Sequence, residues 1–193
     1  PPPMGGVAVH VRQLHDALSR RGLRVTGVDL GQGTHAHVGV TRARPGAPLA
    51  SALFDAPEAL THLHTSGNNP RSFAVAAEVG LLRGLRGPAV VTLHSGLLPA
   101  FLAGARARRL AARVALAPYA RIIAVSEAVA DALHGAGVAA ARVRVHPAFV
   151  ASEVRPRAPS AAVLERLARH RLLLGFAHHP SPIYGRALFF QVL

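Results

Sequence analysis

Histidine, serine and glycine follow directly after a short apolar run near the middle of the chain. The run 89–93 begins after Pro88 and leads straight into His94, Ser95 and Gly96. A run of this length between such residues is typical of a parallel strand that is covered on both faces. Ligands of open α/β sheets bind just beyond the carboxyl ends of such strands, so His94 is a candidate functional residue. A histidine that only caps the strand end is an equally good interpretation of this stretch alone.

Two glycines near the start of the chain, Gly5 and Gly6, stand before a predicted helix. Apolar residues from Val7 to Leu18 recur at helical spacing, and Gly22 suits the left-handed position at a helix C-terminus. A glycine turn at a helix N-terminus binds anions, because free N–H groups and the helix dipole point at the ligand. An ordinary loop is the alternative, since two glycines are less than a full dinucleotide fingerprint.

Histidines alternate along two further stretches. His62 and His64 lie in the predicted strand 59–65, where alternation places both side chains on one face. His64 is nearer the carboxyl end and is the better candidate for a ligand contact, although a structural histidine fits equally well. His35 and His37 could present two imidazoles to a metal ion. Because no third ligand is apparent nearby, we favour exposed loop histidines at these two positions.

The rest of the chain alternates between strand patterns and helix patterns. Asn69 before Pro70, and Ser126 before an apolar helical pattern, are typical N-caps. The alternation favours an α/β fold with a parallel sheet and right-handed crossovers. Such a domain begins with a strand before its glycine turn, so we expect the first strand to be lacking from this sequence. The predicted strands are 24–30, 35–40, 59–65, 89–93, 121–125 and 142–146, and the predicted helices are 7–22, 72–85, 99–118, 127–134 and 160–169.

Three other segments lead to specific expectations. The segment 42–48 resembles a turn, and the proline-rich segment 148–159 resembles an interdomain linker. A strand at 171–177 would begin a second domain that is too short here to hold a core. The predicted helix 99–118 is strongly basic, and its expected apolar side consists of Leu102, Leu110, Val114 and Ala117.

The composition excludes several classes of protein. Half of the 193 residues are hydrophobic, which suffices for a sizeable core, and no run is long enough to span a membrane. There is no cysteine, which excludes disulfides and thiolate metal sites. The net charge of +13 comes from 22 arginines without lysine, which raises the alternative of a non-enzymatic module that binds nucleic acid or another anion. We consider nucleic acid an improbable partner, because no helix-turn-helix, zinc or base-stacking motif is present.

The motifs in order resemble those of one family. PMGGVAVHVRQLHDALSRRGLRVTGV is followed by THLHTSG, GPAVVTLHSG, ARIIAVSEAVADAL and VRVHPAFV. Together they resemble the N-terminal half of family 4 retaining glycosyltransferases, which have two Rossmann-like domains of the GT-B type. The resemblance implies a doubly wound parallel sheet with helices on both faces. It places the N-terminal, acceptor-side domain at 1–150, and the linker and truncated start of a nucleotide-sugar-binding domain at 151–193. A dehydrogenase is disfavoured by the short glycine motif, although Asp29 suits one.

The resemblance also implies roles for single residues. His94 matches the histidine that contacts the donor sugar at the catalytic cleft. Donor-binding positions are Gly5, Gly6 and Ser126, and looser matches on the acceptor side are His64, Asn68, Ser95 and Gly96. The implied substrates are a nucleotide sugar and a carbohydrate or lipid-linked acceptor, with no metal or other cofactor. The family's phosphate-binding and paired glutamate residues have no counterpart in these 193 residues, so we expect this fragment alone to be inactive.

A basic helix face suggests contact with a membrane surface. Arg106, Arg109 and Arg113 are spaced three and four residues apart, so they share one face of the predicted helix. Relatives that act on lipid-linked acceptors imply a cytoplasmic protein that contacts the inner membrane surface peripherally. We expect weak, salt-sensitive binding to anionic lipid, because each arginine near such a surface contributes on the order of 1 kcal/mol. A solvated face of an arginine-rich protein is the alternative.

Overall fold

The computed structural model describes residues 6–30, 40–43, 45–54, 59–84, 87–148 and 158–170. The chain divides into two compact units, Pro1–Val150 and Ala151–Leu193. Predictions for Gly5, for His35 and His37, and for a strand at 171–177 lie outside the described residues.

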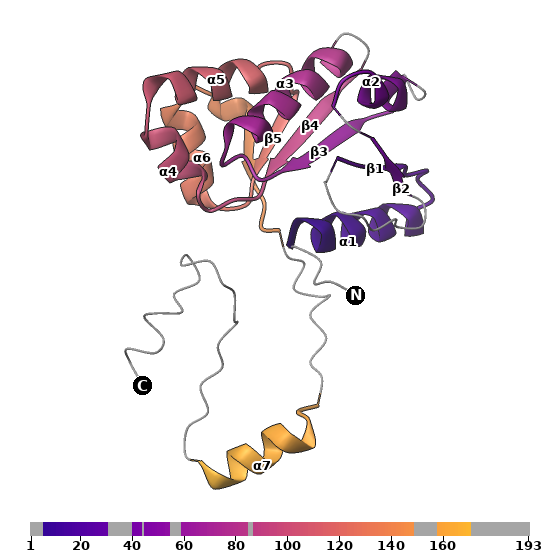
Figure 1. Cartoon of the computed structure of the whole chain (residues 1–193), viewed down its shortest axis with the longest axis vertical. Coiled ribbons are helices and arrows are strands. Elements are labelled where there is room, and N and C mark those ends of the chain that lie inside the picture. The colour runs from indigo at the N-terminus through magenta and orange to yellow at the C-terminus, as the bar shows by residue number, and fades with distance from the viewer. Residues whose placement is uncertain are drawn as a thin grey trace. The chain divides into compact units, whose positions relative to one another are not determined.

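Two parallel sheets form the centre of the first unit (Figure 1). The larger sheet has the order β3-β4-β5-β6, and the smaller pairs β1 with β2. Every pairing is parallel, as the alternation of strands and helices predicted. The strands are β1 (Gly27–Asp29), β2 (Val40–Arg42), β3 (Thr61–Thr65), β4 (Ala89–Leu93), β5 (Arg121–Ala124) and β6 (Val143–Val145).

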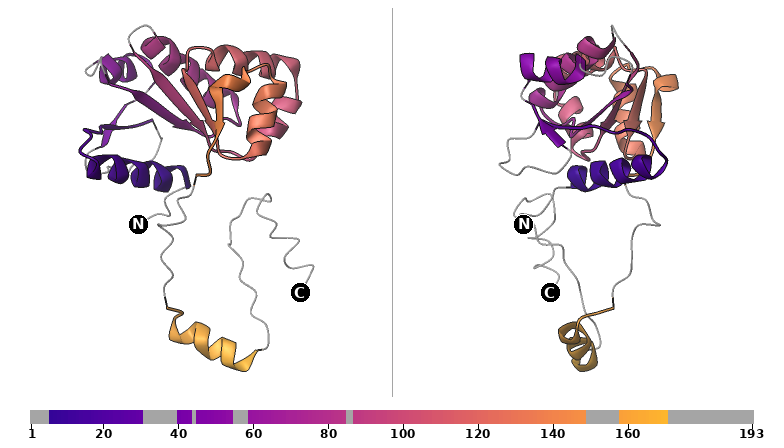
Figure 2. Two further views of the ribbon diagram at one scale, coloured as in Figure 1. Left: turned by 180° about the vertical axis from the view of Figure 1, so that it is seen from behind. Right: turned by 90° about the vertical axis from the view of Figure 1, so that its right-hand side faces the viewer.

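Helices lie on both sides of the four-stranded sheet (Figures 1 and 2). One face is crossed by α1, which packs against β3, and the opposite face carries α3 and α5, which pack against each other. The predicted α/β Rossmann-like fold is therefore confirmed. The helices of this unit are α1 (Gly6–Arg20), α2 (Ala47–Phe54), α3 (Pro70–Gly84), α4 (Leu98–Ala103), α5 (Arg106–Leu116) and α6 (Glu127–Gly135), with a short 3-10 helix at Ala140–Arg142.

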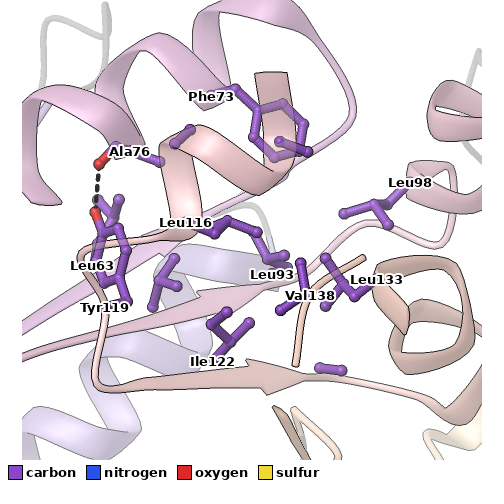
Figure 3. Packing of buried hydrophobic residues seen from close by; sticks show 14 of the residues in the cluster. Leu63, Phe73, Ala76, Leu93, Leu98, Leu116, Tyr119, Ile122, Leu133 and Val138 are labelled. Carbon is purple, nitrogen blue, oxygen red and sulfur yellow. Dashed lines mark hydrogen bonds between the residues drawn. The ribbon is translucent and has the colours of Figure 1, made fainter. Parts of the chain in front are cut away.

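The two faces of the sheet differ in burial. Leu63 and Ile122 point to the face under α3 and α5 (Figure 3). Val91 is the register partner of both, and all three belong to the hydrophobic core. The residues that alternate with these along β3, β4 and β5 point to the face under α1, and most of them are only partly buried. No residue of α1 itself is fully buried. The core therefore lies on one side of the sheet, and the face toward α1 is left for polar side chains.

Tyr119 anchors the start of β5 to α3. Its hydroxyl donates a hydrogen bond of 2.7 Å to the carbonyl oxygen of Ala76 (Figure 3). Gly80 permits this approach, because a Cβ at that position would lie 2.9 Å from Cε2 of Tyr119. The contact ties the segment that leads into β5 to the helix that covers the sheet.

Several predicted helix ends are confirmed. The side chain of Asn69 caps α3 by accepting from the N–H of Ser72 at 2.9 Å, and Ser126 caps α6 by accepting from the N–H of Val129. Gly22, just after α1, has a φ of 79°, which an amino acid with a Cβ rarely adopts. In the second unit, Ser160 caps α7 (Ala161–Arg169), and every residue of that helix is exposed.

The prediction of a single helix over 99–118 was wrong. The structure has α4 and α5, separated at Ala105, whose backbone is extended with φ −166° and ψ 146°. Gly104 ends the first helix, and glycine is the poorest helix former after proline. Of the expected apolar side, Leu102 is buried as predicted, but Leu110 is 61% and Val114 is 63% exposed, so that part of the prediction was wrong. Close packing of α5 against α3 favours small side chains, and the buried face consists of Ala112, Ala115 and Leu116.

Two other boundaries differ from expectation. The segment 42–48, predicted as a turn, contains the start of α2, which has Pro48 in its first turn and buries Leu49. Its Leu53 packs against the core, so tertiary contacts stabilise a helix that has a weak sequence pattern. The predicted strand 24–30 is confirmed only over Gly27–Asp29.

Candidate active site

The carboxyl ends of β3 and β4 meet at one edge of the four-stranded sheet. Thr65 and Leu93 are partners in the register, so Ser66 and His94 leave the sheet at the same level. The N–H of His94 donates to the carbonyl of Thr65 at 3.0 Å, and the N–H of Ser95 donates to that of Ser66 at 3.0 Å. These bonds hold the loop after β4 beside the loop after β3. The structure thus places His94 and His64 together at this edge.

Four imidazoles gather here, and we call them the histidine cluster: His10, His62, His64 and His94. His64 Nδ1 and His94 Nε2 lie 3.1 Å apart. The ring of His10 meets both of them edge-on, with centroids 5.4 Å from His64 and 5.1 Å from His94. His62 lies against His64 with a centroid separation of 4.1 Å. Three separate segments of the chain therefore contribute to one polar group.

The strand period and the position of α1 explain the cluster. His62 and His64 are two residues apart on β3, so they share one face of the sheet. Thr92 is the register partner of His64 on β4, and its buried Oγ1 lies 2.8 Å from Nε2 of His62. His10 reaches the same face from α1, which packs on β3. Each histidine thus lies between the sheet and α1.

Burial keeps these histidines neutral. Desolvation, with a smaller effect of the His10 imidazole, lowers the pKa of His62 to about 4. Desolvation together with the three neighbouring imidazoles lowers the pKa of His64 to about 3. Desolvation, followed by His10 and His62, lowers the pKa of His94 to about 4. Desolvation and the nearby His146 also lower the pKa of His10. At pH 7 the rings therefore act as neutral hydrogen-bonding groups and potential metal ligands.

The nitrogen atoms of the cluster converge closely enough to hold a metal ion. His10, His64 and His94 each offer a ring nitrogen, and the three nitrogens lie within 4.8 Å of one another. Among the described residues, Nδ1 of His10 is buried without a hydrogen-bond partner.

The loop after β3 is built by its own polar side chains. The hydroxyls of Ser66 and Ser72 lie 2.8 Å apart, and Nδ2 of Asn69 donates to Oδ1 of Asn68 at 3.0 Å. Gly67, in the same loop, has a φ of 71° and is buried against Leu93 at the end of β4 and Leu98 at the start of α4. Asn68 is half-buried and lies in the loop that follows His64 and the end of β3.

The other predicted donor and acceptor positions surround the same edge. Gly6 is the first residue of α1, one turn or about 6 Å before His10, so the helix start is close to the cluster. Ser95 is half-buried, and its hydroxyl accepts from the N–H of Leu97 at 3.1 Å. Gly96 is exposed, with open space where a Cβ would be. Ser126 begins α6 after β5, where it is exposed.

The three arginines of the predicted membrane face lie elsewhere. Arg106, Arg109 and Arg113 are on α5, which packs against α3 on the face opposite to α1. Arg109 is half-buried and the other two are exposed. The exposed Leu110 and Val114 lie on the same helix. No helix in the described part of the chain is long and apolar enough to cross a bilayer.

Sequence reasoning missed two members of the cluster. His10 was not singled out, and His62 was regarded only as the strand neighbour of His64. A signal for His10 was present, because it lies four residues after Gly6 on the helix that begins at the predicted anion site. No sequence pattern, however, shows which face of that helix meets the sheet.

Comparisons with known proteins agree with this architecture. A comparison with curated protein sequences gives no significant match. A sequence model of the family described as Glycosyltransferase Family 4 matches residues 4–154, which is most of the 193-residue chain. The matched segment begins just before the glycine turn and includes α1, both sheets and the histidine cluster. The chain therefore belongs to glycosyltransferase family 4.

Proposed function

We propose that the protein transfers a hexosyl group from a nucleotide sugar to an acceptor, with retention of configuration. The observation that carries this proposal is the position of His94, directly after β4 and within reach of the start of α1, in a chain of this family. The carboxyl end of a central parallel strand is where α/β enzymes bind their substrates.

His94 acts on the donor sugar as a neutral group. Burial and the neighbouring histidines lower its pKa to about 4, so near pH 7 its ring can donate or accept a hydrogen bond without carrying charge. We assign it a catalytic role in orienting the sugar and in stabilising charge that develops at the reacting centre. Its hydrogen-bonded neighbour His64 holds the ring in place.

The donor diphosphate binds at the N-terminus of α1 in this proposal. Gly6, which follows Gly5 in the sequence, has open space where a Cβ would be, and the first turn contains no acidic side chain that would repel an anion. The helix dipole adds a favourable interaction of about 0.3–1 kcal/mol for a negative group at this end. Ser126, at the start of α6, completes the donor side. Residues 151–193 would be the linker and the start of the domain that binds the nucleotide.

The acceptor binds on the loops after β3 and β4. His64 lies at the carboxyl end of β3 and Asn68 in the loop after it, and Ser95 and Gly96 come from the loop after β4. The space at Gly96 would admit a bulky group such as a carbohydrate or a lipid-linked sugar. We expect the transfer itself to need no metal ion, since the developing charge on the diphosphate would be stabilised by N–H groups and by basic residues of the second domain.

Nucleic-acid binding is not favoured as the main function. Part of the positive charge is used inside the fold: Arg83 is fully buried and donates from Nη1 to the carbonyl of Leu53 at 3.0 Å. Arg142 donates from Nε to the carbonyl of Tyr119 at 3.1 Å and from Nη2 to that of Ala117 at 3.0 Å. Arginines held in this way are not available to phosphates.

Peripheral contact with the inner membrane surface is part of the proposal. On α5, Arg106, Arg109 and Arg113 accompany the exposed Leu110 and Val114. Such a face suits anionic lipid, because the arginines attract the headgroups and the apolar side chains enter the interface. Changing the three arginines to Gln should abolish sedimentation with phosphatidylglycerol vesicles at low salt. Equal sedimentation of the wild type and the triple variant would exclude α5 as the membrane contact.

The central experiment tests His94 in the complete gene product. Purified protein is incubated with a panel of UDP-, GDP- and ADP-sugars and with saccharide and lipid-linked acceptors. Proton NMR then assigns the anomeric configuration of the product. We expect His94→Ala to lower kcat/KM by roughly 100-fold, the scale of misplacing a reacting group by about 1 Å. His134→Ala, an exposed histidine on α6, is the matched control. Normal transfer by His94→Ala would refute the assigned role.

A further inference from the structure

We propose that His10, His64 and His94 form a binding site for a divalent transition-metal ion of the Zn²⁺ class. Imidazole nitrogen is a preferred ligand of zinc, and three histidines with one open position form a known type of zinc site. The three side chains lie on α1, at the end of β3 and directly after β4. Binding of the ion does not depend on the proposed transfer reaction.

The distance between two of the ring nitrogens already suits a common metal. Two nitrogens on one tetrahedral zinc lie about 3.3 Å apart, because each Zn–N bond is about 2.0–2.1 Å long. His64 Nδ1 and His94 Nε2 are 3.1 Å apart. Without an ion, the N–H of one ring donates a hydrogen bond to the bare nitrogen of the other. With the ion, both rings direct lone pairs at it and carry their protons on the opposite nitrogens.

His10 supplies the third ligand. Its Nδ1 is buried and has no hydrogen-bond partner among the described residues, which is costly for a polar atom. One ring nitrogen from each of the three histidines lies within 4.8 Å of the other two, so the longest separation must shorten by at most about 1.5 Å to reach the spacing on zinc. A small shift of α1 can provide this movement, because none of the residues of this helix is fully buried.

His62 supports the site without being a ligand. Its Nε2 is hydrogen-bonded to the buried Thr92, and its ring lies against that of His64 with centroids 4.1 Å apart. This contact restricts the orientation of His64 and shields it from water. Packing of this kind around a metal ligand fixes the ring and strengthens binding.

The ion would compete with the proposed role of His94. Zinc on Nε2 of His94 would replace the hydrogen bond to His64 that holds the His94 ring in place for the sugar. This consequence, unlike the binding itself, rests on the proposed function. Zinc should therefore inhibit transfer, and a chelator should restore it.

Binding is tested without any nucleotide sugar. Zn²⁺ titrated into the metal-free protein in a calorimeter should bind with a stoichiometry near one, and Co²⁺ should give the visible absorption bands of a four-coordinate ion. His10→Ala and His94→Ala should each weaken the affinity for Zn²⁺ by on the order of 100-fold, since even loss of a supporting neighbour costs about 10–100-fold. His134→Ala should bind like the wild type, and circular dichroism checks that each variant is folded.

Two results would overturn the site. The first is an unchanged affinity in both His10→Ala and His94→Ala, which would place the ion at other histidines of the chain. The second is an equal loss in His134→Ala, which would show non-specific surface binding. Inhibition is measured separately, as the zinc concentration that halves transfer by the complete gene product. If zinc binds but does not inhibit transfer, the competition with the sugar is rejected. If zinc inhibits transfer but the calorimeter detects no binding in the absence of a nucleotide sugar, the metal site is rejected.

Discussion

Replacement of Gly67 by alanine should destabilise the loop that positions Asn68 and His64. The backbone of Gly67 has a φ of 71°, and a Cβ there would lie 2.9 Å from Cδ2 of Leu93 and 2.9 Å from Cδ1 of Leu98. Both leucines are fully buried, so neither can move aside into solvent. The left-handed backbone costs about 1–2 kcal/mol with a Cβ present. Overpacking of a filled core costs a further 1–3 kcal/mol or so.

The expected loss of unfolding free energy is therefore about 2–5 kcal/mol. For a protein of this size, each kcal/mol lowers Tm by about 2–4 °C, so a decrease on the order of 10 °C is expected. Thermal unfolding followed by circular dichroism at pH 7.5 measures this change. Gly96→Ala is the matched control: this glycine lies on the neighbouring loop, has open space around its Cβ position and has no positive φ. Its Tm should stay within about 2 °C of the wild type.

A second variant separates the strain of the left-handed backbone from the overpacking against Leu98. Leu98→Val removes the terminal methyl group nearest to the new Cβ, so overpacking should be relieved in the double variant Gly67→Ala/Leu98→Val. The double variant should be at least about 1 kcal/mol more stable than the sum of the single changes predicts. Additive losses would indicate that the contact with Leu98 contributes nothing, which leaves backbone strain and the contact with Leu93 as causes. An unchanged Tm for Gly67→Ala would refute both the left-handed turn and the tight packing of this loop.

Three further predictions concern the histidine cluster and two of the hydrogen bonds that support the site. The folded chain keeps His62 and His64 neutral, with pKa values of about 4 and about 3 against 6.5 in the unfolded chain, so the unfolded state takes up more protons below pH 6.5. Acidification from about pH 6.5 to about pH 4 should therefore lower the free energy of unfolding by up to about 1.4 kcal/mol per pH unit for each histidine, measured by urea unfolding with EDTA present. A flat profile would contradict the burial of the cluster, whereas His64→Gln should lower the slope and the control His134→Gln should leave it unchanged. Tyr119→Phe should cost about 1–1.5 kcal/mol in urea unfolding at pH 7.5, because it removes the buried bond to the carbonyl of Ala76; a stability equal to the wild type would contradict that bond. Ser126→Ala should lower stability by about 1 kcal/mol through loss of the α6 cap, and Ser126→Asp should restore most of it; if alanine and aspartate are equally stable, the cap contributes nothing.

Local pattern determined much of the fold. The apolar run of β4, bounded by Pro88 and Gly96, could only be a short buried strand, and the structure confirms its limits at Ala89–Leu93. The caps at Asn69 and Ser126 were also predictable, because each is a bond between a side chain and a backbone group three residues away. The position of His94 at the strand end followed from the same pattern. These features depend only on residues that are close together in the sequence, so the sequence alone predicts them.

Packing of helices decided what local pattern could not. The helix pattern over 99–118 continues through Gly104, and only the structure shows the break at Ala105. Leu110 and Val114 looked like core residues, yet α5 turns its alanine face toward α3 and leaves both exposed. Hydrophobic spacing identifies an apolar stripe, but the neighbouring helix determines which stripe is buried.

The histidine cluster shows the same division at the site. Alternation along β3 already placed His62 and His64 on one face, and the strand end identified His94. That His94 approaches His64 depends on the register of β3 with β4, and that His10 joins them depends on how α1 crosses the sheet. The lowered pKa values follow from these contacts, because desolvation arises only when distant segments pack together. The sequence by itself therefore determined which strand ends carry polar groups, whereas the tertiary structure alone decided that three segments bring their imidazoles to one place.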